Sequence, residues 1–369
     1  MGGDGLRLGV DGRELRAEVR TGIGRYLTEV LRAAARDGWE CLVYGDGELA
    51  LGVPGVTVRV LAARATPWWD QVTLPRQLGK DRVSVFLSPY YKGPLLAPCP
   101  VVVTVHDLFF IGYPGRPRPV YDAAATAAAR LYARRATAII ADSEYSKRAV
   151  VTRLRVRPAK VVVIPVALAP GFGPASLGAA PRQRYGIASP YILYVGNFKP
   201  HKNLPALLRA YARLPEPLRA AHRLVLAGGD REGRPDLERL ARDLGVADRV
   251  GFPGPIDEAD LPGLYGEAAL FVLPSLEEGF GLPAVEAMAC GTPVLASNRA
   301  ALPEVLGDAA LFVDPADEAA VTGAMARGLS DGGLRDALRR RGLGRARAFA
   351  PDRTAGRVLA LLREVGIRS

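Results

Sequence analysis

Residues 274–293 read PSLEEGFGLPAVEAMACGTP, and this stretch indicates the fold more directly than any other part of the chain. It follows an apolar run, Leu270–Leu273, that predicts a buried strand. Pro283 suits the first turn of a helix, so we expect a strand, a glycine loop and a helix in succession. Gly279 and Gly281 allow backbone amides to approach a ligand, and the helix start turns its unpaired N–H groups toward the same place. This arrangement is typical of a diphosphate site.

Two glutamates flank the expected helix start. Glu278 lies in the loop and Glu286 one turn inside the helix, eight positions later. Eight helical positions span ~12 Å, whereas the two carboxyl groups of a retaining hydrolase lie only ~5.5 Å apart. We therefore expect two separate polar contacts and not an acid and a nucleophile acting together. The alternative is that both glutamates only cap or solvate the helix.

Apolar runs rich in valine and isoleucine alternate with alanine- and leucine-rich helical stretches in both halves of the chain. This pattern predicts an α/β protein with two doubly wound parallel sheets, which face each other across a cleft at the carboxyl ends of their strands. The expected strands are 6–10, 56–60, 83–87, 101–105, 138–141 and 161–165 in the first sheet, and 191–195, 224–227, 250–252, 270–273, 294–296 and 311–313 in the second.

The chain is long enough for two domains. Its 369 residues exceed what one hydrophobic core usually supports. Proline and glycine are dense over 169–181, which predicts a linker without a regular element. The expected domains are 1–170 and 186–350, with the linker at 171–185 between them.

Composition and charge limit the class of protein. Hydrophobic residues make up 49% and charged residues 24% of the chain, as in globular proteins. The three cysteines have no CxxC spacing, and no signal peptide or apolar run of ~20 residues is evident, so we expect a cytoplasmic protein. Residues 1–170 hold 24 Lys and Arg against 15 Asp and Glu, within a net charge of +11. High arginine usage alone, a phosphorylated substrate or an anionic membrane would each account for this excess.

A nucleic-acid partner is not expected, because the basic residues are not interleaved with exposed aromatic residues and no recognition motif is present. The basic and apolar stretch 147–160 suits peripheral contact with anionic lipid at the inner face of the membrane. Its alternative is a solvated helix face followed by a strand.

The whole chain resembles the nucleotide-sugar-dependent glycosyltransferase family 4, whose members have the GT-B fold. Residues 274–293 match the family's two glutamates separated by seven residues, and Tyr194–Leu204, YVGNFKPHKNL, is similar to the phosphate-binding segment of the family's second domain. Segments 226–230 and 297–304 are also similar to the family. The resemblance implies two Rossmann-like domains and a C-terminal helix, 351–369, that crosses back to pack on the first domain.

The resemblance implies a donor site in the second half of the chain. Glu278 would contact the hydroxyls of the donor sugar and Glu286 the ribose. Lys202 would hold the diphosphate, because its compact ammonium lies beside a helix start. Asn197 stands where many family members have arginine, and Lys199 and His201 are the candidate cationic substitutes. The complete set of expected donor-binding residues is Gly22, Gly24, Asn197, Lys202, Gly228, Glu278, Gly279, Phe280, Gly281, Leu282 and Glu286.

Three segments of the first half supply further candidates. Gly22 and Gly24 open a helix after the first strand, where their amides would close over the diphosphate or form only a tight turn. His106 and Asp107 follow a buried strand. The resemblance implies that His106 sits beside the transferred sugar, while Asp107 orients the imidazole, receives the acceptor hydroxyl or caps a helix.

Arg25, Ser143 and Tyr145 are expected on the acceptor side. The alternative for Ser143 is a capping box, since it precedes a predicted helix.

These features predict a retaining, front-face glycosyl transfer in which Lys202, glycine amides and the 279–282 loop stabilise the leaving diphosphate, with His106, Asp107, Lys202 and Glu278 as the catalytic group. No Asp-x-Asp pair is evident, so we expect no metal and no cofactor. The expected substrates are a UDP- or GDP-linked sugar, with GDP-mannose preferred, and a glycan, lipid-linked or small-molecule acceptor.

Three other classes remain as alternatives. A nucleotide-sugar epimerase or a hydrolase on the same fold would use the donor without an acceptor. A Rossmann dehydrogenase is disfavoured because Leu27 replaces the third glycine of its fingerprint.

Overall fold

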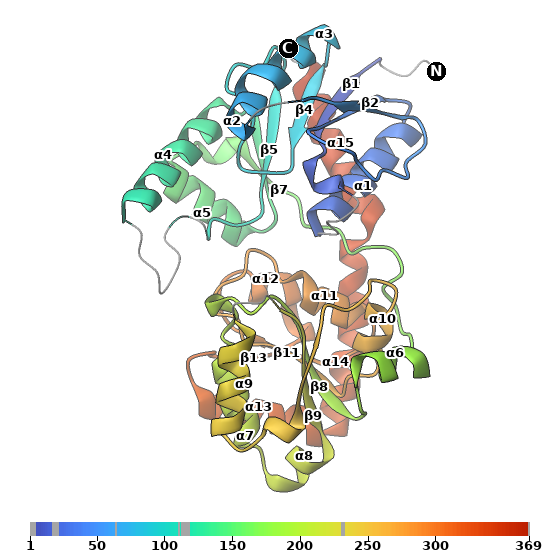
Figure 1. The fold of residues 1–369 in the computed structure, drawn as a ribbon, viewed down its shortest axis with the longest axis vertical. Helices are drawn as coiled ribbons and strands as arrows, with labels where there is room; N and C mark the ends of the chain where they lie inside the picture. The colour runs from blue at the N-terminus through green and yellow to red at the C-terminus, as the bar shows by residue number, and fades with distance from the viewer. Residues whose placement is uncertain are drawn as a thin grey trace. The chain divides into compact units, whose positions relative to one another are not determined.

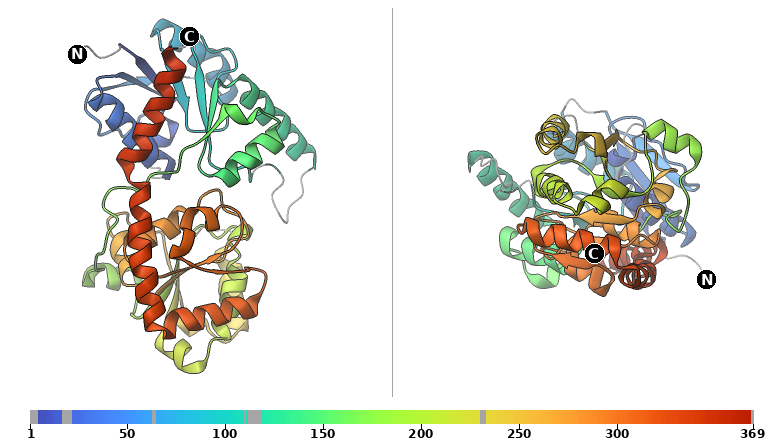
Figure 2. Two further views of the ribbon diagram at one scale, coloured as in Figure 1. Left: turned by 180° about the vertical axis from the view of Figure 1, so that it is seen from behind. Right: turned by 90° about the horizontal axis from the view of Figure 1, so that it is seen from below.

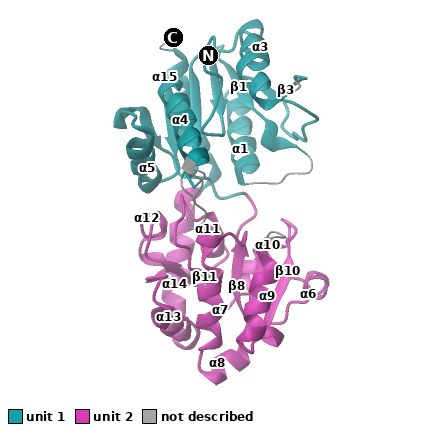
Figure 3. Ribbon diagram, turned by 60° about the vertical axis from the view of Figure 1, so that its left-hand side comes forward, with its two compact units in different colours: residues 1–169, 350–369 teal, residues 170–349 magenta. Residues whose placement is uncertain are grey.

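The structure is a computed structural model that describes residues 5–16, 22–62, 65–109, 111, 119–229 and 233–367. Asp230 of the segment 226–230, and residues 368–369 of the expected C-terminal helix, lie outside this part of the chain. The chain forms two compact units (Figure 3). The first unit comprises Met1–Ala169 together with Ala350–Ser369, and the second unit comprises Pro170–Phe349.

The first unit contains a seven-stranded parallel sheet with the order β3-β2-β1-β4-β5-β6-β7 (Figure 1). Its strands are β1 Arg7–Asp11, β2 Glu40–Gly45, β3 Val56–Val60, β4 Val85–Ser88, β5 Val101–Val105, β6 Ala138–Ala141 and β7 Val161–Val163. Strand β2 was not expected from the sequence. Its four central residues, Cys41–Tyr44, are all buried, and so short an apolar run has no periodicity that separates a strand from a helix segment.

Helices cover both faces of this sheet. Successive strand residues alternate between two apolar clusters, with Val102 in one cluster and Val101 and Val103 in the other. The helices of the first unit are α1 Gly22–Arg36, α2 Thr66–Trp68, α3 Leu74–Lys80, α4 Pro119–Arg135, α5 Glu144–Leu154 and α15 Pro351–Ile367. Helix α15, the last element of the chain, packs against α1 and buries Val358 and Leu362 in the same cluster as Val102 (Figure 2). The expectation that the C-terminal helix returns to the first domain is confirmed.

The second unit contains a six-stranded parallel sheet with the order β10-β9-β8-β11-β12-β13. Its strands are β8 Tyr191–Gly196, β9 Arg223–Gly228, β10 Val250–Gly254, β11 Leu270–Leu273, β12 Val294–Ser297 and β13 Leu311–Val313. Its helices are α6 Ala179–Tyr185, α7 Leu204–Ala212, α8 Glu216–Ala221, α9 Arg234–Asp243, α10 Leu261–Gly266, α11 Leu282–Ala289, α12 Leu302–Leu306, α13 Glu318–Ser330 and α14 Gly332–Ala346. Every strand expected from the sequence is present in one of the two sheets. Helix α6 occupies residues for which a linker without a regular element was expected.

Both sheets reverse their strand order beside their first strand. The reversal lies between β1 and β4 in the first unit and between β8 and β11 in the second. Open α/β sheets bind ligands beyond the carboxyl ends of the strands at such a point, because the connections there diverge to opposite faces. The segments after these four strands are therefore where a site is to be sought in each unit.

Candidate functional site

In the second unit, the segments that follow β8 and β11 meet through a buried ion pair. Lys202, which ends the short helix η4 Pro200–Lys202, places its Nζ 2.6 Å from Glu278 Oε1. The Ser275 hydroxyl donates to the same oxygen at 2.7 Å. The side chains of Lys202 and Glu278 are only 11% and 8% exposed. The structure thus brings together the two side chains expected to bind the phosphate and the sugar of the donor.

Glu286 lies on the helix that follows the loop and has a different partner. The Tyr265 hydroxyl donates to Glu286 Oε2 at 2.8 Å, and both side chains are buried. Lys202 and Ser275 thus contact Glu278, whereas Tyr265 contacts Glu286. Which parts of a substrate the two glutamates bind stays a prediction.

The loop between the two glutamates ends at a glycine that no other residue replaces without strain. Gly281 has a φ of 92°, and a Cβ built on it would lie 2.4 Å from Leu302 Cδ2. Helix α11 begins at the next residue with Pro283 in its first turn, as the sequence predicted. The aromatic ring of Phe280 points into the protein and meets Phe349 edge-on, with ring centroids 5.3 Å apart. Gly279 is buried and Leu282 is half-buried beside it.

A second close backbone approach lies at the end of β9. Gly228 has a φ of 90°, and a Cβ there would lie 2.6 Å from the carbonyl oxygen of Gly196. This contact lets the ends of β8 and β9 lie side by side, so the Gly228 position is fixed by packing within the sheet.

The cationic clamp expected around Asn197 is only partly present. Asn197 is exposed, and its side-chain oxygen accepts a hydrogen bond from the Lys199 amide at 3.3 Å, which stabilises a local turn. Lys199 is also exposed. His201 is buried, and this burial, reinforced by the neighbouring Lys202, lowers the pKa of its ring to about 4. A ring with this pKa is neutral at neutral pH, which disfavours His201 as a cationic substitute for the arginine.

In the first unit, His106 follows β5 as expected. Its Nδ1 lies 2.8 Å from Asp142 Oδ2, at the end of the neighbouring strand β6. The Asp107 carboxylate instead accepts a hydrogen bond from the Phe109 amide at 3.1 Å, within its own turn. The expectation that Asp107 orients the imidazole is therefore wrong, because a buried carboxylate on the next strand has that position. His106 belongs to the first unit and Glu278 to the second, and their action on one donor stays a prediction.

The other first-unit candidates lie at the starts of helices. Gly22 and Gly24 form the first turn of α1, followed by the half-buried Arg25. The Ser143 hydroxyl caps α5 by accepting from the Ser146 amide at 3.0 Å, which is the N-cap half of the expected capping box, and its acceptor-side role stays a prediction. Tyr145 is half-buried in the first turn of the same helix.

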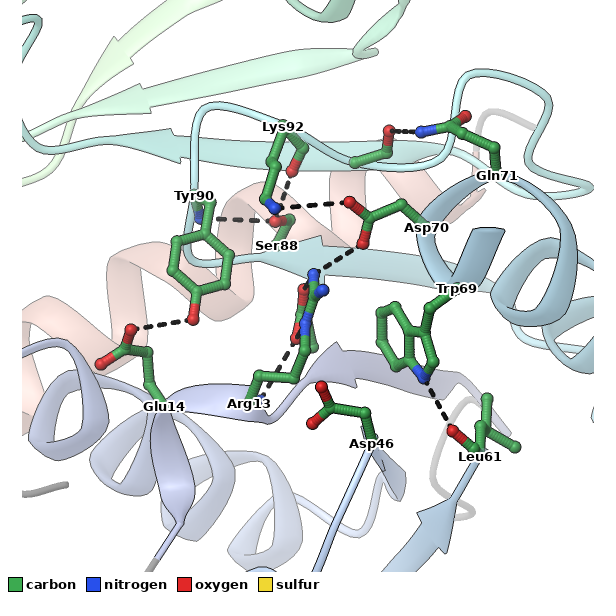
Figure 4. A network of polar contacts seen from close by, with 12 residues as sticks. Arg13, Glu14, Asp46, Leu61, Trp69, Asp70, Gln71, Ser88, Tyr90 and Lys92 are labelled. Carbon is green, nitrogen blue, oxygen red and sulfur yellow. Dashed lines mark hydrogen bonds and ion pairs between the residues drawn. The ribbon is translucent and has the colours of Figure 1, made fainter. Parts of the chain in front are cut away.

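A polar network at the point where the first sheet reverses its order was missed by the sequence analysis (Figure 4). Arg13 contacts Asp11 Oδ2 at 2.5 Å and Asp70 Oδ1 at 2.8 Å, and its guanidinium lies 4.1 Å from the centroid of the Trp69 ring. Burial raises the pKa of the Asp11 carboxyl, although the hydrogen bonds and charge of Arg13 oppose this effect. Applying the strand-end argument to residues 11–13 would have found the start of this network.

The edge of the same network is less deeply buried. Lys92 Nζ lies 3.4 Å from Asp70 Oδ2, and the Tyr90 hydroxyl donates to Glu14 at 2.9 Å (Figure 4). Tyr90, Glu14 and Lys92 are all half-buried, so the network extends from the sheet to the surface of the unit.

No group of three or more His, Cys, Asp or Glu side chains in the described part of the chain is arranged to hold a metal ion. Within the same ranges, no helix has both the length and the apolar character required to cross a membrane.

Comparisons with known proteins agree with the architecture. Residues 20–170 match the family model Glycosyltransferase Family 4, and residues 182–345 match the model Glycosyl transferases group 1. The chain is similar to the O-antigen chain mannosyltransferase B of Escherichia coli, with 36% identity over 170 residues, or 46% of this chain and 44% of that protein. It is also similar to the D-inositol 3-phosphate glycosyltransferase of Actinosynnema mirum, with 37% identity over 215 residues, or 55% of this chain and 51% of that protein. The chain thus spans about half the length of these two relatives.

A solved structure covers the whole chain. Sucrose-phosphate synthase from Thermosynechococcus elongatus superposes with a TM-score of 0.81 at 22% identity, over 99% of this chain and 100% of that chain. At this identity the likeness concerns the fold.

Proposed function

This chain belongs to glycosyltransferase family 4, the glycosyl transferases group 1, and from that membership we propose that it is a retaining transferase, which moves a hexosyl group from a nucleoside-diphosphate sugar to an acceptor hydroxyl. Its two parallel sheets are the two halves of the GT-B fold. The observation that carries the proposal is the Lys202–Glu278 ion pair. It places a cation beside a carboxylate that can accept hydrogen bonds from sugar hydroxyls, beyond the carboxyl ends of β8 and β11.

In this proposal, the two residues of the pair bind different parts of the donor. The Lys202 ammonium meets the diphosphate, where negative charge grows as the glycosidic bond breaks, and Glu278 accepts hydrogen bonds from sugar hydroxyls. Ser275 keeps a hydrogen bond to Glu278 while Lys202 turns to the phosphate. Charge stabilisation of the leaving group in a water-poor site is the main catalytic term.

Retention follows from a front-face reaction in this proposal. The different side-chain partners of Glu278 and Glu286 support two separate contacts with the donor, without a two-carboxylate mechanism. The leaving diphosphate itself helps to deprotonate the acceptor hydroxyl. Proton NMR of the product tests this directly, because a retained anomeric configuration supports the mechanism and an inverted one refutes it.

We propose GDP-mannose as the donor. The support is the similarity to a relative whose name describes a mannosyltransferase. A thermal-shift panel of nucleotide sugars tests it, since a ligand at ~100 times its dissociation constant adds ~2.7 kcal/mol of stability. A shift with GDP-mannose that exceeds the shifts with UDP-glucose and with GDP alone supports the assignment. A larger shift with UDP-glucose refutes it.

The acceptor is proposed to be a glycan, a lipid-linked sugar or a small molecule, reached at the surface of an anionic membrane. Helix α4 supports the membrane contact, because Val120, Tyr121 and Leu131 are 83%, 58% and 46% exposed along it. Arg134 and Arg135 are exposed at its C-terminal end, and α5 beside it carries further exposed arginines. Exposed apolar and basic side chains on one helix suit the surface of an anionic bilayer.

Vesicle flotation tests the membrane contact. Substitution of both Arg134 and Arg135 by glutamate is expected to abolish binding to vesicles that contain phosphatidylglycerol. The matched control replaces Arg239 and Arg242, two exposed arginines of α9, in the same way. Equal loss in both variants, or no binding by the unsubstituted protein, refutes the α4 surface.

A further inference from the structure

The His106–Asp142 contact joins the ends of two neighbouring strands in the first unit. Strands β5 and β6 pair in parallel, and His106 and Asp142 are the residues directly after each strand. Asp142 is 4% exposed, and its Oδ2 lies 2.8 Å from His106 Nδ1. The main chain of His106 is held on the other side, where its carbonyl oxygen accepts from the Ser146 hydroxyl at 3.5 Å.

The other ring nitrogen of His106 has no such partner. Nε2 is buried and makes no hydrogen bond to any residue in the described part of the chain. The ring meets Tyr26 of α1 edge-on, with centroids 6.1 Å apart. Buried polar atoms in proteins are nearly always hydrogen-bonded, so a buried ring nitrogen without a protein partner points to water or to a ligand.

The carboxylate determines which nitrogen changes its proton. An ionised carboxylate only accepts hydrogen bonds, so Nδ1 carries a proton whether the ring is neutral or charged. Nε2 is then the atom that gains or loses a proton, and in the neutral ring it is an acceptor. Asp142 also raises the pKa of His106 above its ordinary value, against the opposing effect of burial, and the carboxylates of Asp107 and Glu14 act in the same direction.

We propose that Asp142 is a positioning residue for His106, which fixes the ring with its proton on Nδ1 and presents Nε2 as a hydrogen-bond acceptor to a hydroxyl group of the bound sugar. The inference rests on the proposed function for the identity of the ligand. The protonation state of the His106 ring is a property of the free protein and is independent of the proposed function.

Nitrogen NMR of histidine-labelled protein tests the state of the ring. The chain contains only three histidines, His106, His201 and His222, so substitution of the other two by glutamine assigns the His106 signals. At a pH above its pKa, we expect the shifts of a ring protonated on Nδ1. Asp142→Asn is expected to lower the His106 pKa by about one unit or more and to increase the fraction protonated on Nε2.

Asp107→Asn is the matched control for this measurement. It removes a carboxylate close to the ring in sequence but leaves the Nδ1 contact intact, so the ring should keep its proton on Nδ1 and its pKa should fall less than in Asp142→Asn. Unchanged His106 shifts and an unchanged pKa in Asp142→Asn would overturn the proposal, whatever the activity of the variant.

A double-mutant cycle separates positioning from a purely structural role. Asp142→Asn alone is expected to reduce kcat/KM roughly 10-fold or more, because a ring with its proton on Nε2 no longer presents that nitrogen as an acceptor. In a His106→Gln background the same substitution should cost nothing further. An equal loss in both backgrounds overturns the proposal. Failure of donor binding in the unsubstituted protein would refute the proposed function and leave the NMR result standing.

Discussion

Substitution of Lys202 by methionine tests the buried ion pair of the second unit most sharply. It leaves the Glu278 carboxylate, 8% exposed, without its cation. Removing one partner of a buried pair costs ~3–5 kcal/mol, because a charge stays buried without compensation. The Ser275 hydroxyl still donates to Glu278, which places the expected loss at the lower end, ~3 kcal/mol. For a unit of this size, that loss corresponds to a decrease in Tm of ~6–12 °C.

The double variant Lys202→Met, Glu278→Gln provides the comparison. Without either charge, no ion is left buried, so the loss should be ~1 kcal/mol, which is ~2 kcal/mol less than in Lys202→Met alone. All three tryptophans, Trp39, Trp68 and Trp69, lie in the first unit, so their fluorescence does not report on this change. Hydrogen exchange of peptides that cover β8 measures the stability of the second unit directly. A double variant that is destabilised as much as Lys202→Met, or a loss below ~1 kcal/mol in Lys202→Met, would show that no uncompensated charge is left buried.

Three further predictions concern stability. Gly281→Ala should cost ~2 kcal/mol or more, because its φ of 92° is strained for alanine and its Cβ would meet Leu302, and a urea titration that shows no loss would contradict this. His201 has a folded pKa of about 4 against 6.5 for the ordinary ring, so the unfolded chain binds the extra proton between these values. Stability should fall by up to ~3 kcal/mol as the pH drops from about 6.5 to 4. A His201→Gln variant with an equally steep decrease would assign the effect to another group. Arg13→Met should cost ~3 kcal/mol or more, since it leaves the buried Asp11 carboxylate without its cation, while Asp70 keeps Lys92. Arg16→Met removes an exposed ion pair with Asp46 and should cost under ~1 kcal/mol. Unfolding followed by tryptophan fluorescence compares the two variants, and equal losses in Arg13→Met and Arg16→Met would contradict this expectation.

The strands were predictable because parallel sheets covered on both faces need continuous apolar runs. Val101–Val105 and Leu270–Leu273 are such runs, and both form strands. Glu40–Gly45 was not predicted because its apolar run is only four residues long and comes soon after the end of helix α1 at Arg36, so it could be taken for part of the helix. Helix α6 was not predicted because the density of proline and glycine before it suggested a linker up to residue 185, whereas the helix already begins at Ala179.

The candidate site was predictable only as single residues. Sequence motifs located Lys202, Glu278 and His106, but not the partner of each side chain. Lys202 and Glu278 are 76 positions apart, and they meet because β11 pairs with β8. His106 and Asp142 are 36 positions apart, and they meet because β6 pairs with β5. Such contacts depend on the strand order, which local periodicity does not contain.

The same limit explains the error at Asp107. Proximity in sequence suggested Asp107 as a partner of His106, beside an acceptor-binding or a helix-capping role, but its carboxylate accepts a hydrogen bond within its own turn. The Arg13 network was overlooked because its members come from 11–14, 69–70 and 88–92, and no single one of these segments has a recognisable motif.

We propose that the second unit holds a nucleotide sugar through two glutamates that bind different parts of it, Glu278 the sugar and Glu286 the ribose. Calorimetric titration of each glutamine variant with GDP-mannose and with GDP alone tests it most directly. We predict that Glu278→Gln weakens the binding of GDP-mannose about 10-fold or more and leaves the binding of GDP nearly unchanged, whereas Glu286→Gln weakens both by similar factors. Equal weakening of GDP and GDP-mannose in Glu278→Gln, or unchanged binding of both in both variants, would contradict the account.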